Sequence, residues 1–149
     1  MRVYYDTGIL LKLYTEETQS PLVWAYVTAA GEPILVNDFH LAECASALRL
    51  KQFRGECEAK QAARALYFLE ADIRAGMLRR SSLDWEEAWR ECRSLANCHA
   101  GATGCRTLDT LHVACARGAH ATAFVTSDRR QTALAELVGM PVINPFEET

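Results

Sequence analysis

Short apolar runs alternate along the chain with longer stretches in which apolar residues recur at the helical period. The short runs are rich in β-branched and aromatic residues and show little apolar–polar alternation. That pattern is typical of strands covered on both faces, as in a parallel sheet. Four runs are clear, and the weaker run 77–80 fits an edge strand. The predicted strands are 3–5, 34–36, 77–80, 123–126 and 142–143.

Seven stretches with helical periodicity lie between these strands. Predicted N-caps are Ser20, Asp38 and Asp84, and Gly31 and Gly76 follow helix ends, as helix-start and helix-stop residues do. Residues 98–106, with two glycines, are expected to form a surface loop. The predicted helices span 8–14, 21–30, 39–53, 56–75, 85–96, 108–117 and 130–138.

Strands that alternate with helices predict right-handed crossovers and an α/β fold. The expected architecture is a three-layer α/β/α sandwich around a central, mostly parallel sheet of about five strands. The 149 residues suit a single domain over residues 1–149, because a chain of this length can bury roughly 70% of its unfolded surface.

Composition narrows the setting of the protein. Sixteen Lys and Arg against 19 Asp and Glu give a net charge of −3, so overall charge gives no argument for nucleic-acid binding, although a local basic rim remains compatible. The chain opens without a signal peptide and has no apolar run near the ~20 residues of a membrane span. We therefore expect a cytoplasmic protein with reduced cysteines, no membrane association, and a zinc site at Cys92, Cys98, His99 and Cys105 only as an alternative.

Four carboxylates fall where an open α/β sheet binds ligands, beyond the carboxyl ends of its strands. Asp6 directly follows the first strand and Asp128 follows the strand at 123–126. Glu43 lies in the second turn of a helix after the second strand, and Asp109 lies in the first turn of another helix.

Each of three acids has a simpler interpretation. Asp6 and Asp128 fit N-caps, and Asp109 fits the positive end of a helix dipole. Glu43 fits neither, because its neighbours are almost all apolar and a buried carboxylate without a partner is costly. A divalent cation resolves this conflict: Mg²⁺ or Mn²⁺ prefers oxygen ligands and suits the hydrolysis of a phosphodiester.

Four segments in this order resemble the PIN-domain ribonucleases, most closely the VapC-type toxins of toxin–antitoxin pairs. The resemblance extends from the first strand to Ile143-Asn144-Pro145. The segments are Asp6-Thr7-Gly8-Ile9-Leu10, Leu41-Ala42-Glu43, Leu108-Asp109-Thr110-Leu111-His112 and Val125-Thr126-Ser127-Asp128-Arg129.

The resemblance implies a metal-dependent ribonuclease with four acidic residues, which correspond here to Asp6, Glu43, Asp109 and Asp128. Asp6 and Asp109 are expected to contact Mg²⁺ or Mn²⁺ most directly, and Glu43 and Asp128 to complete the site. Thr7 and Thr126 are expected to bond a water or a phosphate. Many relatives carry Ser or Asn where this chain has Gly8, so a polar contact expected there is missing.

Other residues have two interpretations. Arg129 is expected to contact phosphate, because an acidic pocket needs nearby cations to admit a polyanion. His112 is expected to make a structural hydrogen bond rather than to bind metal.

Relatives of this type are usually homodimers and are inhibited by a cognate antitoxin. Trp24, Tyr26 and Leu50 are candidates for such contact surfaces. The rival hypothesis is a non-catalytic PIN-like module that binds RNA or protein without cutting.

Overall fold

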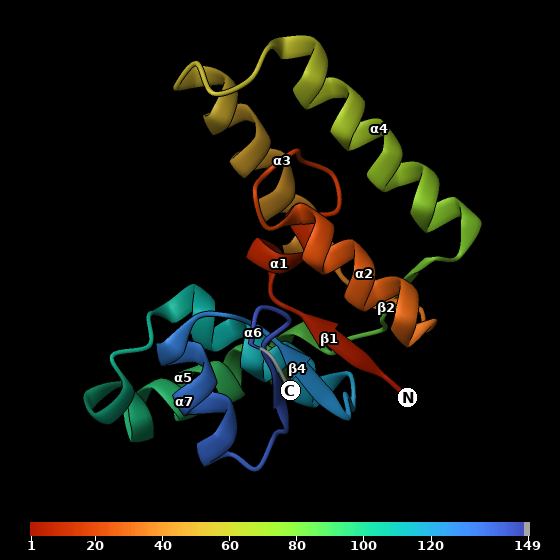
Figure 1. Ribbon diagram of the computed structural model, residues 1–149. Helices are drawn as coiled ribbons and strands as arrows, with labels where there is room; N and C mark the ends of the chain where they lie inside the picture. The colour runs from red at the N-terminus through yellow and green to blue at the C-terminus, as the bar shows by residue number, and fades with distance from the viewer. Residues whose placement is uncertain (148–149) are drawn as a thin grey trace.

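The computed structural model describes residues 1–147, which build a five-stranded sheet with every strand pair parallel (Figure 1). The spatial order is β3-β2-β1-β4-β5, so the chain moves outward from β1 on one side and then returns to the other side at β4. The strands are β1 (Val3–Tyr5), β2 (Ile34–Val36), β3 (Leu78–Arg80), β4 (Ala123–Val125) and β5 (Val142–Ile143). The predicted α/β/α class is confirmed, with a sheet that is wholly parallel.

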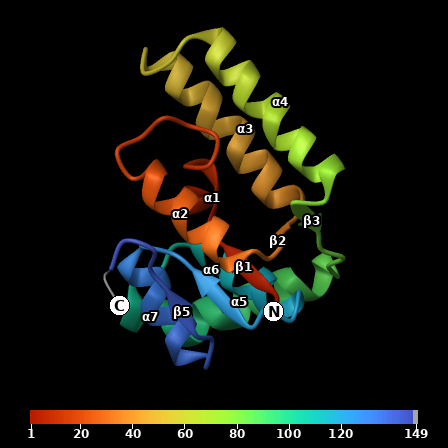
Figure 2. The same cartoon turned by 45° about the vertical axis from the view of Figure 1, so that its right-hand side comes forward.

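The sheet separates two apolar cores. One face carries α1 (Thr7–Leu11), α2 (Ser20–Ala30), α3 (Asp38–Phe53) and α4 (Ala59–Ala75), and the other carries α5 (Trp85–Thr103), α6 (Thr107–Gly118) and α7 (Arg129–Leu137). Figure 2 shows these two layers on opposite sides of the strands. Alternate strand residues feed each core: Val3 and Tyr5 pack on the first layer, and Tyr4 packs on the second.

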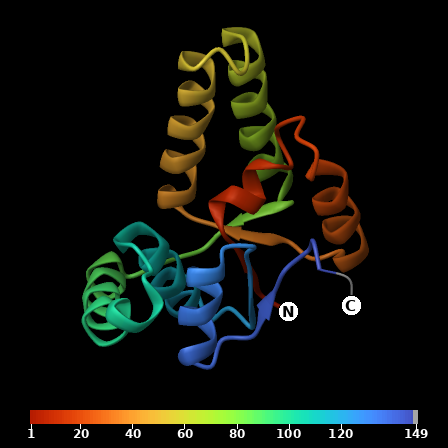
Figure 3. The same ribbon diagram turned by 60° about the vertical axis from the view of Figure 1, so that its left-hand side comes forward.

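The helices α3 and α4 form an antiparallel pair that rises away from the sheet (Figure 3). Only the lower part of the pair reaches the sheet core, through residues such as Cys44 and Leu69. Its far end exposes apolar side chains, with Phe53 86% exposed. Among the described residues, no helix is long and apolar enough to cross a membrane.

Two predicted helix starts are wrong by one residue. Asn37, not Asp38, caps α3: its side chain accepts from the N–H of His40, and the His40 ring accepts from the N–H of Asn37. Ser20 is the first residue of α2 rather than its cap, and its hydroxyl donates to the carbonyl of Thr15. At α3 the cap is still local but lies one residue earlier than predicted, and at α2 the Ser20 hydroxyl bonds the preceding loop instead of capping the helix. Asp84 caps α5 as predicted.

The predicted surface loop at 98–106 is also wrong over most of its length. Helix α5 continues to Thr103 and ends at Gly104, whose φ of 68° is the left-handed conformation that glycine adopts without strain. Two other helices end or begin so that they are shorter there than predicted: α1 ends at Leu11 rather than at residue 14, and α4 begins at Ala59 rather than at residue 56.

Candidate active site

Asp6 lies directly after β1, at the carboxyl edge of the sheet. Its backbone N–H donates to the carbonyl of Val125 (2.9 Å), which ties it to β4 at the point where the strand order reverses. Open α/β sheets bind ligands in the crevice at this point. Asp6 occupies the N-cap position of α1, but its side chain accepts no capping hydrogen bond. Capping therefore does not account for this carboxylate.

Glu43 is held at the same edge by two side chains. Its Oε1 accepts a hydrogen bond from Thr7 Oγ1 (2.7 Å) and one from His112 Nε2 (2.5 Å). The Glu43 side chain is 29% exposed, so it lies at the margin of the interior rather than within it. His112 Nε2 is also 3.9 Å from Asp6 Oδ1. One buried histidine thus stands between two of the predicted acids.

Asp128 and Asp109 lie at the starts of α7 and α6. Asp128 caps α7, because its Oδ1 accepts from the N–H of Gln131 (2.9 Å). The capping interpretation is therefore correct for Asp128, and it uses one of the two oxygens. Asp109 is 3.7 Å from the Nε of Arg106, whose side chain is 82% exposed. Such an exposed pair stabilises little.

The four carboxylates influence one another electrostatically. Burial raises the pKa of Asp6 above its ordinary value, and the charges of Asp109 and Glu43 add to that rise against the influence of His112. Burial likewise raises the pKa of Asp109, with the charge of Asp128 adding to it. Residues far apart in the sequence thus contribute to one region of negative potential.

Glu43 behaves differently from Asp6 and Asp109. Burial favours its neutral form, but the hydrogen bonds from His112 and Thr7 outweigh burial and lower the pKa of Glu43. Among these three acids, Glu43 is therefore stabilised by hydrogen bonds, whereas the charges of Asp6 and Asp109 are poorly compensated. Poorly compensated carboxylates are the groups that gain most from a bound cation.

A chain of hydrogen-bonded polar side chains in the interior holds Glu43 in place through His112. Asn37 Nδ2 donates to the Tyr4 hydroxyl oxygen (3.2 Å), so the Tyr4 hydroxyl donates its own proton to His112 Nδ1 (3.0 Å). Because His112 Nδ1 is then an acceptor, the ring carries its proton on Nε2 and donates it to Glu43. This assignment of the His112 tautomer follows from the network. The predicted structural hydrogen bond of His112 is thus present. The sequence analysis missed Tyr4 and Asn37, because a strand tyrosine and a cap asparagine give no local signal of this role.

His40, which the sequence did not distinguish, lies beside this chain. It is fully buried, and its Nε2 lies 2.7 Å from the carbonyl oxygen of Tyr5. Burial, with the nearby His112 adding to it, lowers the pKa of His40 to about 3. His40 is therefore a neutral structural residue.

Thr126 and Gln131 support the other two acids. Thr126 is fully buried, its hydroxyl donates to Gln131 Oε1 (2.7 Å), and it accepts from the N–H of Asp128 (3.1 Å). Gln131 Nε2 in turn donates to the carbonyl of Asp109 (3.2 Å). Gln131 is a second residue that sequence analysis missed. Its spacing, three residues after the cap Asp128, was the only signal that could have found it.

Thr7 and Arg129 complete the predicted set. Thr7 is buried and binds Glu43 rather than facing open solvent. Arg129 is the first residue of α7, next to Asp128, and its side chain is exposed. It lies at the rim of the acidic region, where a cation can meet an approaching anion.

The donor set fits Mg²⁺ or Mn²⁺ by its chemistry. All four predicted ligands offer carboxylate oxygens, and among the described residues no Lys or Arg forms an ion pair with Asp6 or Glu43. Within residues 1–147, no three Asp, Glu, His or Cys side chains already form a group that could hold a metal ion. The alternative zinc site, at Cys92, Cys98, His99 and Cys105, is likewise not formed in the described part of the chain.

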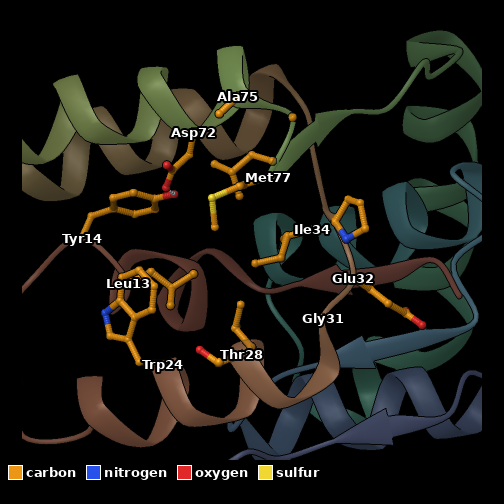
Figure 4. Close-up of a pocket in the computed structure, with 14 residues that line it drawn as sticks. Leu13, Tyr14, Trp24, Thr28, Gly31, Glu32, Ile34, Asp72, Ala75 and Met77 are labelled. Carbon is orange, nitrogen blue, oxygen red and sulfur yellow. Dashed lines mark hydrogen bonds between the residues drawn. The ribbon is translucent and has the colours of Figure 1, made fainter.

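A cavity of about 400 Å³ lies away from the acids, between α2, the end of α4 and the strands β2 and β3 (Figure 4). Trp24, Leu13 and Met77 surround its apolar part, and the Tyr14 hydroxyl donates to Asp72 Oδ2 (2.6 Å) across one side. None of the predicted site residues lines it. Trp24, predicted as a contact residue, is 44% exposed there, whereas Tyr26 packs on the core beside Tyr5.

The protein is an α/β protein with a wholly parallel sheet, and Asp6 lies where the strand order of that sheet reverses. The PIN domain model matches residues 3–137, and the chain belongs to the PIN domain family, whose members are generally nucleases. The resemblance predicted from the sequence is thereby confirmed.

The fold is similar to that of a chain in the crystal structure of FitAcB from Neisseria gonorrhoeae. The TM-score is 0.64 at 17% sequence identity, over 98% of this chain and 99% of that chain. No curated protein matched the sequence.

Proposed function

We propose that the protein is a divalent-metal-dependent ribonuclease that hydrolyses RNA phosphodiester bonds at Asp6, Glu43, Asp109 and Asp128. The observation that carries the proposal is the position of Asp6 at the reversal point of the sheet, where among the described residues its carboxylate makes no capping hydrogen bond and no ion pair with Lys or Arg. Burial and the charges of Asp109 and Glu43 raise the pKa of this carboxylate, which is the imbalance that a cation would relieve. Asp6 and Asp109 would bind Mg²⁺ or Mn²⁺ most directly, with Glu43 and Asp128 completing the site. When bound, such an ion neutralises charge on the phosphate and lowers the pKa of a bound water.

The other residues have supporting roles in this proposal. Thr7 and His112 orient Glu43, and they leave its Oε2 free of any hydrogen bond found among the described residues. Thr126 and Gln131 fix Asp128 and the backbone of Asp109. Arg129 at the rim attracts the RNA backbone and offsets the repulsion between the acids and a phosphate.

The rival function is a non-catalytic PIN-like module that binds RNA or protein. It requires no cation, so the acids would serve only as caps and surface charges. The lack of a capping bond at Asp6 favours the catalytic proposal.

The test is cleavage of a labelled, structured RNA in Mg²⁺ or Mn²⁺, with EDTA and the variant Asp6→Asn. We expect cleavage by the wild type, none in EDTA, and a loss of at least 100-fold in Asp6→Asn. Glu136→Gln is the matched control, because Glu136 is exposed on α7 and contacts none of the four acids. Cleavage that persists in EDTA, or that Asp6→Asn leaves unchanged, would overturn the proposal.

The biological setting we infer is that of a VapC-type toxin of a toxin–antitoxin pair. Membership of the PIN family and the fold shared with FitAcB support this inference. We further propose a cytoplasmic homodimer that is inhibited by a cognate antitoxin. A small open reading frame next to the gene, encoding a DNA-binding N-terminus, would test the inference directly.

The antitoxin contact that we propose is on the α2 side of the molecule. Trp24 leaves nearly half of its side chain exposed at the rim of the 400 Å³ cavity. A half-exposed tryptophan beside an apolar cavity is the kind of residue that dominates protein interfaces. Leu50, also predicted as a contact residue, is 48% exposed on α3.

A further inference from the structure

A second cavity, of about 250 Å³, lies between the amino ends of β1 and β2, the carboxyl half of β3 and the end of α6. Its lining contains several residues that can bind an anion and, within the part of the chain that the structure describes, no Asp or Glu. The anion-binding residues are Arg2, Arg79, Arg80, Ser81, Ser82 and His120. In a chain of net charge −3, a cavity whose charged lining residues are all basic requires an explanation.

The sheet register brings two of these arginines to one face. Arg79 of β3 is in register with Leu35 of β2, and Leu35 with Tyr4 of β1. Since alternate residues of a strand share a face, Arg2, which is two residues before Tyr4, lies on the same face as Tyr4. The Arg2 side chain extends towards α6 on this face, because its Nη1 donates to the carbonyl of Ala119 at the end of α6 (3.5 Å).

The charges at this cavity are unequally compensated. The Arg80 guanidinium is bound to Asp38 (2.9 Å), so it contributes less to a ligand. Arg79 has no ion pair and no side-chain hydrogen bond among residues 1–147, and it is exposed. Arg79 is therefore the cation that is free to bind an anion, and Arg2 lines the same cavity.

His120 adds a second, independent feature at the same place. Its φ of 55° makes it the one non-glycine residue with positive φ in the described chain. A glycine would adopt this conformation at lower cost, yet the side chain present is a hydrogen-bonding ring that lines the cavity. Backbone strain of this kind concentrates at functional positions.

We propose that this cavity binds a phosphate group, with Arg79 as its principal ligand. Arginine pairs with phosphate through two parallel N–H bonds, and serine hydroxyls such as that of Ser82 add neutral donors. The volume is below the ~300–1,000 Å³ typical of sites for larger ligands, which suits a phosphate group rather than a whole nucleotide. The site is independent of the proposed cleavage, since none of the four proposed acids lines the cavity and phosphate binding there needs no metal.

The test is calorimetric titration with inorganic phosphate at constant ionic strength, in EDTA so that the acidic edge takes no part. We expect phosphate to bind where chloride does not. Arg79→Gln should weaken binding at least tenfold, Arg79→Lys should retain part of it, and Arg93→Gln, an exposed arginine of α5, should change it less than twofold. Equal responses to phosphate and chloride, or undiminished binding by a folded Arg79→Gln variant, would overturn the proposal.

Competition identifies the source of the phosphate group. An oligoribonucleotide with a 5′-phosphate is compared with the same oligonucleotide bearing a 5′-hydroxyl. Competition by both identifies backbone phosphodiesters, competition by the first alone identifies a terminal phosphate, and competition by neither identifies a free phosphate ion. Each of these results supports the site, provided that the binding depends on Arg79.

Discussion

At neutral pH and without metal, ionised Asp6 destabilises the fold, because burial and the charges of Asp109 and Glu43 raise its pKa. An acid whose pKa is higher in the folded state stabilises the fold most when protonated, and this contribution is lost as pH rises through that pKa. Asp6→Asn should therefore raise the melting temperature in EDTA at pH 7 by a few degrees, roughly 2–4 °C per kcal/mol regained. The gain should shrink as the pH falls towards 4.

Thermal unfolding of both proteins across this pH range measures the effect. Millimolar Mn²⁺ should raise the melting temperature of the wild type by mass action and leave that of Asp6→Asn unchanged. A variant that melts lower than the wild type in EDTA at pH 7 would mean that the Asp6 charge is compensated in the fold.

Tyr4→Phe tests the buried network that supports Glu43. The change removes one hydroxyl and leaves Asn37 Nδ2 and His112 Nδ1 without their partner. We expect a loss of about 1–3 kcal/mol in the free energy of unfolding, the usual cost of an unsatisfied buried polar group. Urea denaturation provides the measurement, and Tyr67→Phe is the control, because Tyr67 is 64% exposed on α4. Equal stabilities of the two variants would contradict this role.

The sequence predicted three of the acids from topology, because Asp6 and Asp128 follow strands and Asp109 lies in the first turn of a helix, and it predicted Glu43 from its apolar neighbours. It did not identify Tyr4 or Asn37, because their roles depend on pairings across 33 and 108 residues. It did not identify Gln131, because its bond to the Asp109 carbonyl spans 22 residues and depends on burial that only the folded sheet creates. The hydrogen bond predicted for His112 is present, but its partners Glu43 and Tyr4 are 69 and 108 residues away and were not predicted.

At the scale of elements, α1 brings its own glycine against the site. A Cβ added at Gly8 would lie 3.2 Å from Asp6 Oδ2, a contact that displaces the carboxylate by a few tenths of an ångström. Gly8→Ala should therefore lower metal-dependent cleavage several-fold, without loss of stability, because alanine favours a helix over glycine by up to about 1 kcal/mol. Initial rates and denaturation curves separate the two effects.

Gly101→Ala is the matched control for that experiment. Gly101 lies within α5, and a Cβ added there meets nothing within 4 Å. We expect this variant to gain about 0.5–1 kcal/mol of stability with unchanged cleavage. Full activity of Gly8→Ala would mean that the carboxylate position of Asp6 is not critical.

The same glycine explains why sequence analysis misplaced the end of α5. Gly101 and Gly104 together suggested a loop, but α5 passes through Gly101 and stops only at Gly104, where φ becomes positive. Cys92 and Leu95 bury the helix against α6 and the sheet, and that tertiary packing outweighs the low helix propensity of one glycine.

At the scale of the whole molecule, acids and arginines gather in separate places. Asp6, directly after β1, and Asp109, at the start of α6, are acids with raised pKa values, whereas the arginine-lined cavity lies between β3, the residues before β1 and the end of α6. The architecture was predictable from alternating strand and helix patterns. The basic cavity was not, because only the register β1-β2-β3 brings Arg2 and Arg79 to one face.

Two tryptophans provide a matched test of the proposed antitoxin surface. Trp24 on α2 is 44% exposed beside the 400 Å³ cavity, and Trp89 on α5 is 48% exposed on the other layer of the sandwich. Trp24→Ala should weaken the complex with the antitoxin encoded beside the gene by more than tenfold, since an aromatic anchor at an interface contributes about 2 kcal/mol or more. Trp89→Ala should change it less than twofold. Calorimetry on the folded variants measures both, and the reverse order would assign the antitoxin to the α5 layer instead.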